Sequence, residues 1–123
     1  MTLVSNSGIA LTDRQIEVAE AIVAKLRKEL GTKLCSVWLY DLVPPIEGED
    51  WPLFSILCTV DGGDDFHFKV ICQLYRWIAD VEKSMDAYVE MHSTSDDRFH
   101  WEVRADYNNI RRDGVKFYDR DSA

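Results

Sequence analysis

The sequence predicts a single α/β (α+β) domain in which a mixed β-sheet carries its helices mainly on one face. Its 123 residues suffice for one hydrophobic core but not for two, and 46% of them are hydrophobic, which is typical of a globular chain. Two amphipathic helical segments alternate with short runs of β-branched and aromatic residues, and this order favours helices packed against a sheet. We expect residues 1–123 to form one domain, with a core of residues 12–119 and a flexible segment 1–11.

Residues 13–30 form the first predicted helix, whose beginning and end are both marked in the sequence. Thr12 and Gln15 have the spacing of a capping box, apolar residues follow at helical intervals, and Gly31 supplies a stop signal. A second amphipathic helix is predicted over residues 66–86, and a short helix is predicted to end at Gly114.

Strands are predicted over residues 34–41, 53–61, 88–95 and 115–118, because these runs are rich in β-branched and aromatic residues. The run 53–61 is apolar on both faces for most of its length, as in a central strand that is covered on both sides. Three prolines exclude regular structure from the connection that precedes it. We interpret residues 100–104 as a further short strand.

The acidic balance of the chain limits the partners that it can bind. A net charge of −8 and a pI of about 4.7 argue against a protein that grips phosphate backbones through a broad basic face. They leave room for basic partners, or for an acidic surface that imitates nucleic acid. Carboxylates lie among the clustered arginines of the last third, so we predict a salt-bridged surface there and no direct nucleic-acid contact; these arginines are Arg98, Arg104, Arg111 and Arg112.

The cysteines and the first residues indicate a cytoplasmic protein. Cys35, Cys58 and Cys72 lie among apolar neighbours without metal-ligand spacing, so we expect buried, reduced thiols. Residues 1–14 lack the pattern of a signal peptide, and no apolar window approaches the ~20 residues that span a bilayer. We therefore expect no membrane association.

Two stretches, FSILCTVD (54–61) and NNIRRDGVKFYD (108–119), together with the order of the predicted elements, resemble the minimal nucleotidyltransferase fold of the DNA polymerase β-like superfamily. In that fold a helix leads to a strand ending in Gly-Ser, and a loop then leads to a strand that opens with Asp-x-Asp. The stretch FSILCTVD (54–61) has the pattern of the strand that follows the metal-binding acids, and NNIRRDGVKFYD (108–119) resembles the typical ending of small bacterial members. The resemblance spans roughly residues 12–119 and implies a nucleotidyltransferase-like fold.

When this sequence is matched to the family position by position, the family's catalytic residues are replaced by others. The strand end that should present Gly-Ser reads Tyr40-Asp41, and the Asp-x-Asp positions fall on Leu53 and Ser55. Leucine cannot ligate Mg²⁺, and a serine hydroxyl is a weak neutral ligand compared with a carboxylate. Glu90 is the only candidate for the third family carboxylate.

A shifted register is the one way in which further acids could reach the metal positions. Glu47 and Glu49 have Glu-x-Glu spacing, but they precede Pro52 and therefore lie in a loop. We expect no catalytic residues and no metal site, with Glu90, Glu47 and Glu49 as the weak candidates. One alternative is that the chain is an active Mg²⁺-dependent nucleotidyltransferase. Only in that case do we expect it to bind Mg²⁺ and a nucleoside triphosphate.

The function that the resemblance implies is that of a pseudoenzyme which binds another protein. Superfamily members pair with toxin-like ribonucleases or other effector nucleases, so we expect a prokaryotic or phage antitoxin or inhibitor. A second alternative is a phage-type inhibitor that mimics nucleic acid with its acidic surface. A homodimer is a further possibility, although no residue pattern indicates one. We expect the interface in the acidic stretch, at Asp41, Glu47, Glu49, Asp50, Trp51, Asp64 and Asp65.

Overall fold

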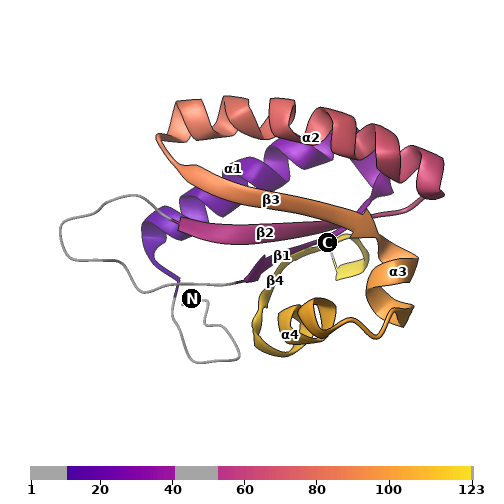
Figure 1. The fold of residues 1–123 in the computed structure, drawn as a ribbon. Helices are drawn as coiled ribbons and strands as arrows, with labels where there is room; N and C mark the ends of the chain where they lie inside the picture. The colour runs from indigo at the N-terminus through magenta and orange to yellow at the C-terminus, as the bar shows by residue number, and fades with distance from the viewer. Residues whose placement is uncertain (1–10, 41–52, 123) are drawn as a thin grey trace.

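A four-stranded mixed sheet forms the centre of the computed structural model, which describes residues 11–40 and 53–122 (Figure 1). The strands are β1 (Leu34–Tyr40), β2 (Leu53–Val60), β3 (Tyr88–Ser95) and β4 (Val115–Asp119). Their order across the sheet is β3-β2-β1-β4, with β2 and β3 parallel and the other two pairs antiparallel. β4 pairs with β1 from far along the sequence, with Asp119 opposite Ser36 and Val115 opposite Leu39. The prediction of a mixed sheet is confirmed.

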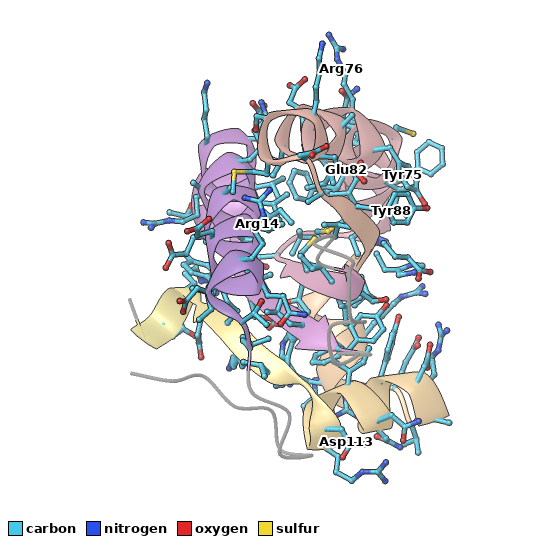
Figure 2. The ribbon with its side chains drawn as sticks, turned by 90° about the vertical axis from the view of Figure 1, so that its left-hand side faces the viewer. Arg14, Tyr75, Arg76, Glu82, Tyr88 and Asp113 are labelled. Atoms are coloured by element: carbon cyan, nitrogen blue, oxygen red, sulfur yellow. The ribbon has the colours of Figure 1, made fainter. Side chains whose placement is uncertain are left out.

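The two long helices cover one face of this sheet, as predicted (Figure 1). The helices are α1 (Asp13–Leu30), α2 (Asp64–Met85), α3 (Asp96–Trp101) and α4 (Ala105–Asp113), with short 3-10 turns at Gly31–Lys33 and Arg120–Ser122. The main core lies between α1, α2 and the sheet. Arg14 of α1, labelled in Figure 2, donates a hydrogen bond to the carbonyl oxygen of Met85 at the end of α2. In the described part of the chain, no helix has the length and apolarity that a bilayer span requires.

The start of α1 follows from its sequence signals. The Thr12 hydroxyl accepts a hydrogen bond from the Gln15 backbone N–H at 3.1 Å, and the Gln15 side chain accepts one from the Thr12 N–H at 3.0 Å. This reciprocal pair is the predicted capping box, which satisfies two donors that the helix leaves open. Gly31 ends the helix at a φ of 57°, a conformation that glycine adopts without strain.

The prediction of a strand over residues 100–104 is wrong, because a short helix begins at Asp96 instead. The Ser95 hydroxyl accepts a hydrogen bond from the Arg98 N–H at 3.2 Å and so caps α3, while Asp96 and Asp97 suit the positive end of its dipole. Phe99 is fully buried from α3. α3 and α4 lie on the face of the sheet opposite the long helices, where a second cluster joins Leu57, Phe99, Tyr107 and Ile110.

The cysteines divide according to the elements that carry them. Cys35 and Cys58 are buried in β1 and β2, and burial raises the pKa of the Cys35 thiol to about 11 and that of Cys58 to about 12. Cys72 is exposed, which corrects the prediction that all three are buried. Its position in α2 lies on the side of the helix that faces away from the sheet.

Candidate functional site

One row of paired residues crosses three neighbouring strands of the sheet, with Tyr40 on β1, Ser55 on β2 and Glu90 on β3. Ser55 is paired with Tyr40 of β1 on one side and with Glu90 of β3 on the other. The Ser55 hydroxyl donates a hydrogen bond to Glu90 Oε2 at 3.3 Å. These are the strand positions at which the resemblance places the Gly-Ser end, the second acid of Asp-x-Asp and the third carboxylate. The structure therefore places two of the positions considered as metal ligands, Ser55 and Glu90, side by side, and Glu90 is the one carboxylate of that pair.

Glu90 is an exposed carboxylate whose two oxygens already have protein donors. His92 Nε2 lies 3.0 Å from Glu90 Oε1, and the Ser55 hydroxyl donates to Oε2. The hydrogen bond and the charge of His92, with a smaller contribution from Ser55, hold the pKa of Glu90 below its ordinary value. Because the side chain is 62% exposed, this carboxylate is ionised and hydrated at neutral pH. Within the ranges that the structure describes, no three His, Cys, Asp or Glu side chains are placed to hold a metal ion together.

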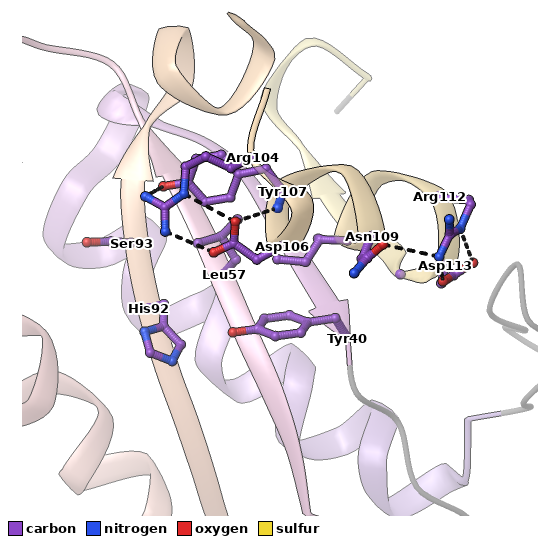
Figure 3. Close-up of a pocket in the computed structure, with 12 residues that line it drawn as sticks. Tyr40, Leu57, His92, Ser93, Arg104, Asp106, Tyr107, Asn109, Arg112 and Asp113 are labelled. Carbon is purple, nitrogen blue, oxygen red and sulfur yellow. Dashed lines mark hydrogen bonds and ion pairs between the residues drawn. The ribbon is translucent and has the colours of Figure 1, made fainter. Parts of the chain in front are cut away.

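A groove of about 690 Å³ opens beside this row, on the same face of the sheet (Figure 3). Tyr40, Leu57 and His92 line it from the strands, and α4 with its flanking residues lines the other side. The groove exists because α4 is held against the sheet by the buried ring of Tyr107, whose hydroxyl donates to Thr94 Oγ1 at 3.1 Å. The remaining lining residues are Ser93, Arg104, Asp106, Asn109, Ile110, Arg112, Asp113 and Gly114.

The two arginines of the groove are each bound to an aspartate. Arg104 donates from Nε and Nη2 to both carboxylate oxygens of Asp106, at 3.2 and 3.0 Å, and its guanidinium lies 4.5 Å from the centre of the Tyr107 ring. Arg112 binds Asp113 in the same bidentate way, at 3.0 and 2.8 Å. The hydrogen bond from Arg112 lowers the pKa of Asp113. These pairs bear out the prediction of a salt-bridged surface, and they leave the groove without excess positive charge for a phosphate.

The surface that the sequence predicts as an interface is only partly described. Asp41, Glu47, Glu49, Asp50 and Trp51 lie outside the described residues, so Glu47 and Glu49 as weak metal candidates lie outside them too. Asp64 and Asp65 form the first turn of α2, and the Asp65 side chain is exposed there.

Trp101 and Val103 are exposed apolar residues that the sequence analysis did not single out. Trp101 is 81% exposed at the end of α3, and Val103 is 90% exposed in the segment that leads from α3 into Arg104 of the groove. Residues two apart on a helix point about 200° away from one another, so burying Phe99 turns Trp101 outward. The sequence signal that could have revealed this exposure is the helix cap at Ser95. A strand over residues 100–104 does not predict that Trp101 points away from the buried Phe99.

Comparison of the chain with protein-family models, with curated proteins and with solved structures found no match. The resemblance to nucleotidyltransferases therefore rests on the residues of this chain alone.

Proposed function

We propose that this chain is a non-catalytic nucleotidyltransferase-like domain that acts by binding another protein, as an antitoxin or inhibitor. The observation that carries the proposal is the hydrogen bond between Ser55 and Glu90. Phosphoryl transfer by two metal ions depends on several carboxylates that share the ions. Here a neutral hydroxyl occupies the place beside the one carboxylate of the pair, and it donates to that carboxylate.

The exposed pair Trp101 and Val103 supports protein binding as the activity. Tryptophan is enriched among the residues that dominate binding energies, and such residues have a surrounding rim of polar groups. The Arg104–Asp106 pair next to Val103 offers a rim of this kind, already ordered by its hydrogen bonds. The class of partner follows from the resemblance, which implies a toxin-like ribonuclease or another effector nuclease.

The absence of catalysis is tested by calorimetric titration of the protein with Mn²⁺ and with ATP and Mg²⁺. The wild type is expected to bind neither at micromolar concentration. Ser55→Asp sets a second carboxylate beside Glu90 and is expected to give measurable Mn²⁺ binding, whereas Ser55→Asn has the same shape without the charge and is expected to give none. Micromolar binding of ATP and Mg²⁺ by the wild type, followed by nucleotide transfer, would refute the proposal.

Protein binding is tested with the product of each neighbouring gene, purified and titrated against the chain. Trp101→Ala is expected to weaken binding of the true partner by about 30-fold or more, the size of a hot-spot effect. Tyr88→Ala, which changes an exposed ring of β3, serves as the matched control and is expected to leave the affinity unchanged. Mild salt dependence fits an apolar anchor; steep salt dependence with full affinity in Trp101→Ala would favour the acidic mimic instead.

A further inference from the structure

α2 has a second apolar face that is not used in the core. Val70, Leu74 and Ile78 point to the sheet and are buried. On another side of the helix, four apolar residues follow one another at intervals of three, one and three residues, which places them along one line of the surface. We name this line the outer face of α2, and it consists of Phe68, Ile71, Cys72 and Tyr75.

The outer face is open to solvent along its whole length. Phe68 is 66% exposed, Ile71 43% and Tyr75 70%, and Cys72 is exposed between them. Figure 2 shows Tyr75 pointing away from the helix on the side opposite α1. At about 200 Å² for a free aromatic ring, Phe68 and Tyr75 together present roughly 270 Å² in each copy. Over two copies these rings contribute roughly 540 Å², well below the ~1,200 Å² at which stable interfaces begin, so the contact is a weak, reversible one.

From these features we propose that the outer face of α2 is the contact of a homodimer, formed by two antiparallel α2 helices around a two-fold axis. With the axis between residues 71 and 72, Phe68 of each copy lies opposite Tyr75 of the other, and Ile71 lies opposite Cys72. The face is therefore complementary to itself: ring meets ring twice, and the small side chains meet at the centre. No charged residue interrupts it, so two copies with a net charge of −8 each can meet there.

The charges beside the outer face fit the same antiparallel register. Asp65 and Arg76 are about three helical turns apart and therefore lie on the same flank of α2. Neither makes an ion pair with another residue that the structure describes. In the antiparallel pair, Arg76 of one copy lies within two residues, about 3 Å along the axis, of Asp65 of the other. Lys69, four residues after Asp65, lies on this flank as well, nearer the two-fold axis. Each dimer thus holds two Asp65–Arg76 pairs between copies.

The test is sedimentation velocity of the full chain from low to high micromolar concentration. We expect a reversible dimer with micromolar affinity. Tyr75→Glu is expected to weaken it about tenfold or more, because it sets a charge against the Phe68 ring of the other copy at both ends of the contact. Trp101→Glu is the matched control, an exposed aromatic residue changed in the same way on the other side of the sheet, and the dimer should persist. A wild type that stays monomeric, or a dimer that only Trp101→Glu disrupts, would overturn the proposal.

Two further measurements test the register. Arg76→Asp is expected to weaken the dimer about fivefold, because it faces Asp65 of the other copy with a like charge, and the exchange Asp65→Arg with Arg76→Asp is expected to restore it. A short bismaleimide should link two copies through Cys72, the exposed cysteine, and Cys72→Ser should remove the link. Failure of the charge exchange together with absence of the link would refute the antiparallel arrangement, even if a dimer forms by another surface. These results do not depend on Ser55 or Trp101, so they stand apart from the proposed function.

Discussion

Replacing Phe99 by alanine tests whether α3 and α4 are held against the sheet as a rigid unit. The Phe99 ring is fully buried, and its centre lies 5.4 Å from that of Trp38 and 5.5 Å from that of Tyr107. Arg111 also lies over the ring at 5.1 Å. Removing a buried phenylalanine ring costs about 3–5 kcal/mol, from the lost apolar burial and the cavity that remains. A domain of this size has a total stability of about 5–15 kcal/mol, so Phe99→Ala is expected to remove a large part of it.

Urea denaturation at a fixed protein concentration measures this loss, and hydrogen exchange at the amides of α4 locates it. Trp101→Ala is the control, because Trp101 is also aromatic and lies two residues away but is 81% exposed. It should change the free energy of unfolding by no more than about 0.5 kcal/mol. A cost below about 1 kcal/mol for Phe99→Ala, with unchanged exchange in α4, would show that the second cluster does not hold α4 to the sheet.

Three more predictions follow from single positions. Gly114→Ala should destabilise the fold by about 1–3 kcal/mol in denaturation, because a Cβ there would lie 2.6 and 2.9 Å from two backbone carbonyl oxygens, whereas Gly63→Ser has open space and should be neutral or better. In an NMR titration, His92→Ala should raise the pKa of Glu90. Folding lowers this pKa, so the ionised Glu90 stabilises the fold at pH values above its pKa in the unfolded chain, and this stabilisation is lost as the pH falls through its pKa in the folded chain. Ellman's reagent should modify Cys72 alone in the native protein, and the other two thiols only after denaturation.

Those parts of the fold that depend on local sequence signals were predictable. The capping box at Thr12 and the glycine stop at Gly31 are local, and the structure has both. The strands were found from composition, and the pairing of Ser55 with Glu90 follows once β2 and β3 lie parallel in this register. α3 was missed because its aromatic and charged residues suit a strand as well as a helix, and only the Ser95 cap separates the two.

The groove and the outer face of α2 could not be read from the sequence, for different reasons. The groove depends on where α4 settles on the sheet, which Tyr107 decides through contacts with residues distant in sequence. The outer face has the same helical spacing as the buried face, so periodicity alone does not separate Ile71, which is 43% exposed, from the buried residues of α2. A helix with two apolar faces cannot bury both against one sheet, and the sequence does not say which face is left outside.

The pairing of β4 with β1 has a consequence for the growing chain on the ribosome. β1 is complete once Tyr40 has been made, but the strand that covers its outer edge is built from residues 115–119. Until those residues emerge, β1 presents unpaired N–H and C=O groups, which is a template for association with other nascent chains. Contacts between such distant segments also form slowly, because a long loop must close first. The edge of β1 therefore stays open to other chains until residues 115–119 have been made and have paired with it.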